Sequence, residues 1–206
     1  MNRFCYLALM VAAGCNSPST APEASTLPAA PATKPAATVP ADTAGPARTA
    51  RRFVSWYATH QKELSNGLVL NDDGLDSTKF YSVDFPDTEN WLRKVAGSGT
   101  VSPAYLDGWR AYFRSYDDTL RLHPQNDGPP AGFDHDLLML SQEPDTKVAD
   151  LQVGTVTVTS RQGNRAQVQA RGPRHEAWQE GLNFEMSRSA DGRWLIDRID
   201  NGSDAF

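Results

Sequence analysis

Asp134, His135 and Asp136 form the segment whose residue types and spacing best favour chemistry. Two carboxylates beside an imidazole can bind a divalent cation, position a ligand or carry out acid–base catalysis. The structural alternative is that Asp134 caps a short following helix while His135 and Asp136 face solvent. We expect Gln142 to hydrogen-bond back to the backbone near Asp134 and to hold the loop, rather than to contact a ligand.

Aromatic residues form a second set of candidates. Trp56, Tyr57, Trp109 and Tyr112 head this set as candidate ligand-binding residues lining a hydrophobic pocket. The alternative is plain core packing, in which a buried Tyr hydroxyl or Trp indole still needs a hydrogen-bond partner. The carboxylates of the first segment can provide one. The remaining aromatic members of the set are Phe113, Trp178 and Trp194.

Other kinds of catalytic or metal site find no support. The acidic segment 71–76 resembles a calcium loop, but the twelfth position counted from Asn71 is Ser82 rather than the required Glu. The sequence has no Gly-x-Ser-x-Gly, His-Glu-x-x-His, Cys-x-x-Cys or Walker motif. We therefore expect neither a metal nor a cofactor. A net charge of −5 argues against a nucleic-acid partner.

The N-terminus has the pattern of an exported precursor. Arg3 precedes an apolar run from Phe4 to Ala13, which is too short to span a bilayer. The run ends in Val11-Ala12-Ala13-Gly14-Cys15, which resembles the lipobox of bacterial lipoproteins. This resemblance implies cleavage of a signal peptide, residues 1–14, and diacylglyceryl transfer to Cys15. An ordinary secretory signal with an incidental cysteine is the alternative. With Asn16 after the cysteine, the resemblance is compatible with an outer-membrane location.

A change of composition marks the domain boundary. Residues 16–46 contain seven of the fourteen prolines, many alanines and no aromatic residue. Such a segment buries too little apolar surface to offset the entropy of ordering. Residues 15–47 are therefore expected to be a lipidated cysteine and a flexible linker. A globular domain is expected over residues 48–201 and a tail over 202–206. Both cysteines, Cys5 and Cys15, precede that domain, so no disulfide supports it.

Hydrophobic periodicity predicts helices followed by strands. Ser102-Pro103 is a typical helix start, with an N-cap followed by proline. Turns are expected at residues 161–164 and 190–192. Together these elements predict an α+β domain with helices packed on one face of a curved antiparallel sheet. The expected helices are 49–64, 88–95 and 103–122, with a possible extended piece at 80–85, and the expected strands are 151–158, 165–170, 183–188 and 193–199.

This order of elements resembles the nuclear-transport-factor-2-like superfamily, which has a cone-shaped α+β fold. The specific similarity is to the bacterial domain of unknown function 3828, over about residues 48–201. It is carried by the aromatic pair Trp56-Tyr57, the segment 133–143 and the closing strand Gly192-Arg193-Trp194-Leu195-Ile196. Leu137 replaces a usual proline, and Glu143 a usual aspartate. The resemblance implies a fold but chooses no activity, because the superfamily includes both enzymes and binding modules.

The first functional hypothesis is a membrane-anchored envelope lipoprotein whose domain binds a small ligand, a peptide or a partner protein without catalysis. The second is an enzyme that uses Asp134, His135 and Asp136 in a cone-shaped pocket. The third is a periplasmic immunity or inhibitor protein that acts through an acidic surface and a protruding loop at residues 123–135. The lining of a cavity between the 103–122 helix and the sheet is the feature that separates the first two hypotheses.

Overall fold

The computed structural model describes residues 44–64, 68–70 and 79–205. The expected signal peptide, Cys15, most of the expected linker and the acidic segment 71–76 lie outside the described residues. Within the described part, none of the helices has the length and hydropathy needed to cross a membrane.

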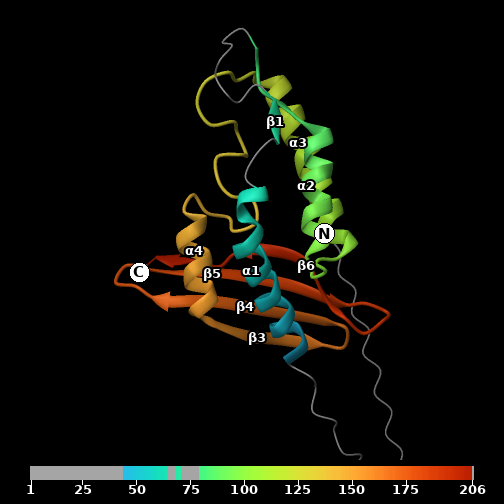
Figure 1. The fold of residues 1–206 in the computed structure, drawn as a ribbon, viewed down its shortest axis with the longest axis vertical. Helices are drawn as coiled ribbons and strands as arrows, with labels where there is room; N and C mark the ends of the chain where they lie inside the picture. The colour runs from blue at the N-terminus through green and yellow to red at the C-terminus, as the bar shows by residue number, and fades with distance from the viewer. Residues whose placement is uncertain (1–43, 65–67, 71–78, 206) are drawn as a thin grey trace, which may run out of the picture. The chain divides into compact units, whose positions relative to one another are not determined.

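The C-terminal half folds into an antiparallel sheet (Figure 1). Its four long strands follow one another in sequence order, and β7 pairs with the beginning of β5. Side chains alternate along β4, where Ala166, Val168 and Ala170 are buried and Gln167 is exposed. One face of the sheet is therefore apolar. The strands are β3 (Thr155–Gln162), β4 (Arg165–Arg174), β5 (Trp178–Arg188), β6 (Trp194–Asn201) and β7 (Asp204–Ala205).

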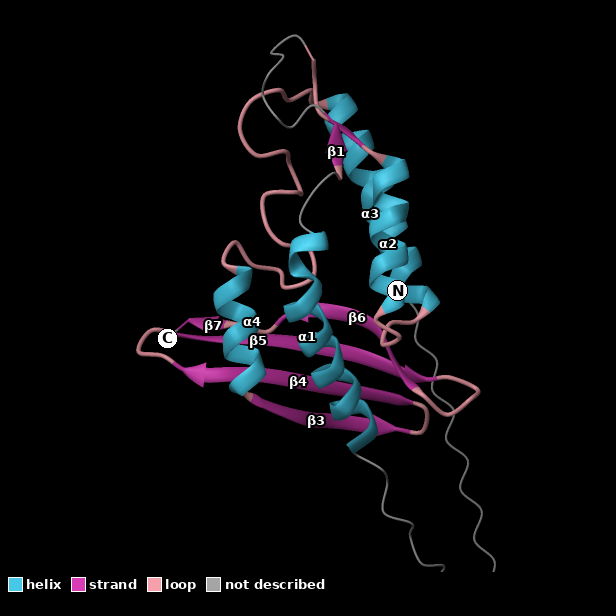
Figure 2. Cartoon of the chain, in the orientation of Figure 1, coloured by secondary structure: helices cyan, strands magenta, loops and turns pink. Residues whose placement is uncertain are grey.

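Helices α1 (Ala44–Leu64) and α4 (Pro144–Val153) lie side by side on the apolar face (Figure 2). The buried side of α1 includes Phe53, which packs edge-on against Phe184 of β5 with ring centroids 6.2 Å apart. The predicted α+β fold, with helices packed on an antiparallel C-terminal sheet, is confirmed.

Helix α1 begins within the segment that was expected to be linker. Its first turn includes Pro46 and Ala47, and the Ala47 side chain is buried. Proline is tolerated in a first turn because the backbone N–H groups there have no intrahelical acceptor. Packing against the sheet thus extends the helix beyond the part in which hydrophobic periodicity is visible.

The expected strand over residues 151–158 is wrong in its first part. Pro144–Val153 form α4, in which Val148 and Leu151 are buried, and β3 begins only at Thr155. Spacing of three residues between these two apolar positions fits a helix. The Val and Thr residues that follow are typical of a strand. Two apolar residues at helical spacing are too few to reveal the helix before them.

Helices α2 (Phe85–Gly97) and α3 (Pro103–Leu122) form an antiparallel pair next to β6. The predicted N-cap is confirmed, because Ser102 Oγ accepts a hydrogen bond from the Tyr105 N–H at 3.2 Å. The connection between the two helices pairs with the free edge of β6: the Ile196 N–H donates to the Thr100 carbonyl, and the Ser102 N–H donates to the Ile196 carbonyl, both at 2.8 Å. These bonds place the start of α3 against the sheet.

A two-residue ladder lies beside α3. Strands β1 (Val69–Leu70) and β2 (Ser82–Val83) pair antiparallel, which confirms the extended piece expected near residues 80–85. The Val83 N–H donates to the buried carboxylate of Asp117 on α3 at 3.2 Å.

Residues 202–205 return to the sheet, although a tail was expected there. The Gly202 N–H donates to the Gly181 carbonyl at 3.0 Å, and β7 pairs with Trp178 and Gln179. A local sequence pattern cannot predict such a pairing, because its partners are more than twenty positions away in the sequence.

Candidate functional site

A hollow of about 340 Å³ opens between α3 and β6. Tyr105, Trp109 and Tyr112 contribute its α3 wall, and Ile199 its β6 wall. The predicted pair Trp109 and Tyr112 therefore does line a common hollow. Gly108 contributes to the lining, and a Cβ atom built there would meet no other atom within 4 Å.

An aromatic cluster holds the α3 wall in place. The Trp109 ring meets Tyr105, Tyr112 and Trp91 edge-on, at centroid distances of 6.2, 5.1 and 5.4 Å. Edge-to-face contacts of this kind stabilise a defined ring orientation. Tyr112 is fixed further, because its hydroxyl donates to the Gly132 carbonyl at 2.5 Å. These contacts give the α3 wall a defined shape.

A β-bulge shapes the opposite wall. Ile196 pairs with Met186, whereas Arg198 pairs with Glu185, so Asp197 is an extra residue in β6. Its carboxylate accepts a hydrogen bond from the Ser187 hydroxyl at 3.0 Å. Bulges re-aim side chains beside binding sites. Here the bulge brings the charged side chains Asp197 and Arg198 into the lining of a mostly aromatic hollow.

Tyr105 combines a place in this wall with a buried hydroxyl. Among the described residues, no group meets hydrogen-bond geometry with this oxygen. Burial raises the pKa of Tyr105, and the nearby Trp109 indole partly offsets that increase. A buried hydroxyl without a well-formed bond costs stability. Within the described part of the chain, the wall thus contains one buried hydroxyl without a hydrogen-bond partner.

Trp56 and Tyr57, the other predicted aromatic pair, are on α1 and do not line this hollow. The Trp56 ring stacks on His60, with centroids 5.0 Å apart, and His60 Nδ1 lies 2.8 Å from the Trp56 carbonyl oxygen. Tyr57 is fully buried. The four candidate ligand-binding aromatic residues are therefore divided between α1 and α3, and Tyr57 belongs to the core, as the alternative interpretation held.

Asp136 acts as the anchor of a tight turn. Its Oδ1 accepts hydrogen bonds from the backbone N–H groups of Leu138 at 3.0 Å and Met139 at 2.6 Å. Its Oδ2 accepts one from the Tyr57 hydroxyl at 2.8 Å. Burial is the main cause that raises the pKa of Tyr57, and the adjacent carboxylate adds to it. Tyr57 therefore stays protonated and remains a donor.

Asp134 and His135 pair with each other at the surface instead. His135 Nδ1 lies 3.0 Å from Asp134 Oδ1, and about half of the Asp134 side chain is exposed. The hydrogen bond from His135 lowers the pKa of Asp134. Residues 137–140 form a turn rather than the short helix considered above, and Asp136 rather than Asp134 caps it. The three residues do not converge on one point.

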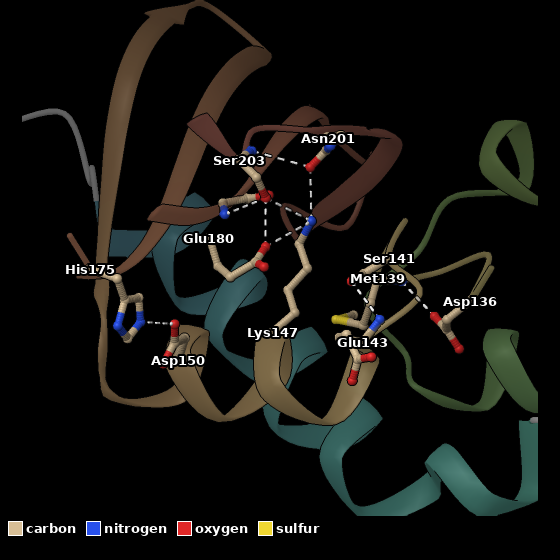
Figure 3. A network of polar contacts seen from close by, with 11 residues as sticks. Asp136, Met139, Ser141, Glu143, Lys147, Asp150, His175, Glu180, Asn201 and Ser203 are labelled. Carbon is tan, nitrogen blue, oxygen red and sulfur yellow. Dashed lines mark hydrogen bonds and ion pairs between the residues drawn. The ribbon is translucent and has the colours of Figure 1, made fainter. Parts of the chain in front are cut away.

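A buried lysine is the centre of a polar network outside the hollow (Figure 3). Lys147 of α4 is 1 % exposed, and its Nζ lies 2.8 Å from Asn201 Oδ1, 3.1 Å from Ser203 Oγ and 3.4 Å from Glu180 Oε2. Burial lowers the pKa of Lys147, whereas the Glu180 charge opposes that effect.

The same network does not arrange Ser203 as a nucleophile activated by this lysine. Ser203 Oγ donates its proton to Glu180 Oε2 at 2.6 Å and accepts a bond from the Gly181 N–H at 3.1 Å. A nucleophile would instead have to give its proton to a neutral lysine. The network therefore holds the C-terminal turn against α4 and β5.

Asp150, one turn further along α4, pairs with His175 (Figure 3). His175 Nε2 lies 2.7 Å from Asp150 Oδ2, and the imidazole stacks on Trp178 with centroids 3.8 Å apart. Across the described ranges, no cluster of three or more His, Cys, Asp or Glu residues is arranged to hold a metal ion.

Several of these residues escaped sequence reasoning. Asp197 and Ile199 enter the hollow because of a bulge, which leaves no mark in the local sequence. Lys147 is a residue type that is rarely buried, and its amine becomes enclosed only through the return of residues 201–203. Gly108 offered a signal, since a glycine inside a predicted helix costs about 1 kcal/mol relative to alanine and so marks an unusual position.

Comparison with known proteins finds no match: no protein-family model, no curated protein and no solved structure corresponds to this chain.

Proposed function

We propose that this protein is a lipid-anchored component of the bacterial envelope, and that its α+β domain binds a ligand without catalysis. The observation that carries the binding role is the aromatic hollow between α3 and β6, built around Trp109. The anchor is inferred from the lipobox-like sequence ending at Cys15.

Size and lining of the hollow indicate the kind of ligand. A volume of about 340 Å³ is at the small end of the range for ligand pockets. Its aromatic wall suits one apolar group, such as an indole or phenyl ring or a leucine side chain, that belongs to a larger ligand. Asp197 and Arg198 can orient polar atoms next to that group.

The other two hypotheses draw less support. Asp136 is committed to three hydrogen bonds, and the Asp134–His135 pair lies outside the hollow. The loop over residues 123–135 is tied down, because the Tyr81 hydroxyl donates to the Gly128 carbonyl and Phe133 stacks on Phe113 of α3. Neither observation favours an enzyme or an inhibitor.

The anchor is tested by metabolic labelling. Radiolabelled palmitate is expected to enter the protein in a bacterial host and to be absent from the Cys15→Ser variant. Unlabelled wild-type protein, or normal processing of the variant, would contradict the lipoprotein proposal.

The binding role is tested by filling the hollow. Gly108→Gln places a side chain in the open space beside Trp109. Free indole and N-acetyl-tryptophanamide serve as probes, and the tryptophan indole N–H signals in the NMR spectrum provide the measurement. We expect Gly108→Gln to weaken probe binding by about tenfold or more, since a lost apolar contact of ring size is worth more than 1.4 kcal/mol.

Gly97→Gln is the matched control. Gly97 is also a helical glycine at which a Cβ atom meets nothing within 4 Å, but it lies at the end of α2 and does not line the hollow. This variant should bind both probes like the wild type. Equal binding by the Gly108→Gln variant would remove the hollow as the site.

A further inference from the structure

Three segments that are distant in the sequence meet at one end of the sheet. They are the first turns of α1 (residues 44–53), the β3–β4 turn with its flanks (159–166) and the β5–β6 turn with its flanks (186–195), and together we call them the basic end. Thr49 Oγ1 donates to the Trp194 carbonyl at 3.2 Å, and the Arg188 N–H donates to the Asn164 carbonyl at 2.8 Å. These contacts bring all three segments together (Figure 1).

The charge of the basic end is opposite to that of the whole chain. Its three segments contain seven arginines and a single acidic residue, Asp191, which pairs with Arg193 at 2.6 Å. The chain as a whole has a net charge of −5, so positive charge is concentrated here. The seven are Arg48, Arg51, Arg52, Arg161, Arg165, Arg188 and Arg193.

Most of these arginines are within reach of a partner, although Arg188 Nε donates a hydrogen bond to the Gly192 carbonyl at 2.9 Å. All are exposed except Arg161, which is partly buried with its guanidinium 5.1 Å from the centre of the Trp194 ring. On α1, the side chains of Arg48, Arg51 and Arg52 are exposed, and they lie on the opposite side of the helix from its buried face, which includes Phe53. A guanidinium donates two parallel hydrogen bonds to a phosphate group, which makes arginine well suited to phosphate-bearing surfaces.

The position of the chain entry favours a membrane as the surface. Helix α1 begins at Ala44 within the basic end, so the sequence that leads back to Cys15 joins the domain there. An anchor on that cysteine would attach the domain through its basic end, so this end is the one that the tether leaves from. Anionic headgroups attract basic side chains at short range, by about 1 kcal/mol for each residue near the surface.

We propose that the basic end docks on an anionic lipid surface, with its arginines binding the phosphate headgroups. The proposal rests on the lipid anchor of the proposed function for its biological setting. Docking itself requires only the arginines, so the two can fail separately. The anchor supplies attachment, and the basic end then sets the orientation of the domain at the membrane.

The experiment uses the full chain with Cys15→Ser, which cannot be acylated. Its partition is measured by sedimentation with vesicles of phosphatidylcholine alone and with vesicles that also contain phosphatidylglycerol. The apolar N-terminal run contributes equally to every variant and is cancelled in the comparison. Phosphatidylglycerol should raise the partition by about tenfold or more, and added salt should remove that increase, since a few arginines near the surface contribute about fivefold each.

A charge-reversal triple then identifies the arginines. Arg48→Glu, Arg52→Glu and Arg165→Glu together should reduce partition into anionic vesicles to the phosphatidylcholine value. The matched control changes the same net charge elsewhere, with Lys62→Glu, Arg93→Glu and Arg114→Glu, all exposed and outside the basic end. It should keep most of the binding. Circular dichroism and thermal melting verify that both triples are folded.

Three results would overturn the proposal. The first is equal partition into neutral and anionic vesicles, and the second is equal loss of binding in the two triples. The third is release of the protein from anionic vesicles by a competing anion. The competitor is either inorganic phosphate, if it releases more protein than chloride at the same ionic strength, or a DNA duplex at the same phosphate concentration. That result would assign the arginines to a free anion or to a nucleic acid instead of a bilayer.

Discussion

Asp136 illustrates how a residue type suited to catalysis can serve the fold. Its carboxylate accepts three hydrogen bonds, two from backbone N–H groups and one from the Tyr57 hydroxyl. Together these bonds tie the turn after residue 136 to α1. An acidic residue in this role needs two acceptor oxygens in the right positions, but it does not need access to a substrate.

At the residue scale we first predict the effect of Tyr57→Phe. Removing the hydroxyl should lower the free energy of unfolding by about 1.5–3 kcal/mol, the usual range for a hydrogen bond to a charged group. Urea unfolding at neutral pH measures it. If the bond to Asp136 is the cause, the effects of Tyr57→Phe and Asp136→Asn should not add in the double variant. Additive effects would show that the hydroxyl matters for another reason.

The second prediction concerns alkaline pH. Burial raises the pKa of Tyr57, Tyr105 and Tyr112 in the folded protein. Unfolded tyrosines lose their protons near pH 10, approximately the ordinary tyrosine pKa, so above that pH the folded state binds more protons than the unfolded state. Stability should therefore be fully present below about pH 10 and should fall as the pH rises further.

The midpoint of urea unfolding, followed from about pH 8 to about pH 11, tests this expectation. The Tyr57→Phe variant has one fewer such group and should lose stability less steeply. A midpoint in the wild type that stays constant through this range would contradict the buried state of these hydroxyls.

At the element scale, the junction between α4 and β3 is the most constrained point. Gly154 connects the two elements, and a Cβ atom there would lie 2.0 Å from the Arg171 carbonyl oxygen of β4. The chain can pass from the helix into the sheet at this point only because the residue has no side chain. The junction places α4, and with it Lys147 and Asp150, over the sheet.

The third prediction compares two glycine-to-alanine variants. Gly154→Ala should destabilise the domain by about 3 kcal/mol or more, because the colliding atom belongs to the backbone of a paired strand. Gly108→Ala should raise stability by up to about 1 kcal/mol, because open space surrounds the new methyl group and alanine favours a helix. Thermal unfolding measures both. Equal melting temperatures in the two variants would contradict this description of the junction.

At the scale of the whole molecule, a single apolar core provides the stability. It extends from Ala50 and Phe53 on α1, through Trp91 and Phe113 on α2 and α3, to Phe184 and Ile196 in the sheet. Burial of this apolar surface is the main favourable contribution. The sequence places both cysteines, Cys5 and Cys15, before the described residues.

The fourth prediction follows from that arrangement. A thiol reductant should leave the melting temperature of the domain unchanged, because no cysteine lies between residues 16 and 206. Differential scanning calorimetry with and without reductant measures this. A decrease on reduction would show that a disulfide between Cys5 and Cys15, or between two chains, supports the fold.

Local sequence determined much of the fold. Ser102-Pro103 defines the start of α3, and glycines at positions 163 and 192 adopt positive φ angles of 56° and 86° in the two hairpin turns. The α+β class follows from the hydrophobic periods of the first three helices and of the long strands, whereas α4 was not predicted. These features depend on residues that are close in the sequence, so the sequence alone is sufficient to predict them.

Tertiary structure alone decided the site. The bulge at Asp197, the burial of Lys147 by residues 201–203 and the separation of Trp56 from Trp109 all depend on contacts between distant segments. The basic end likewise exists only because two hairpin turns and the start of α1 meet. Each of these contacts is selected by the packing of the complete chain, and no local pattern records which distant group will become its neighbour.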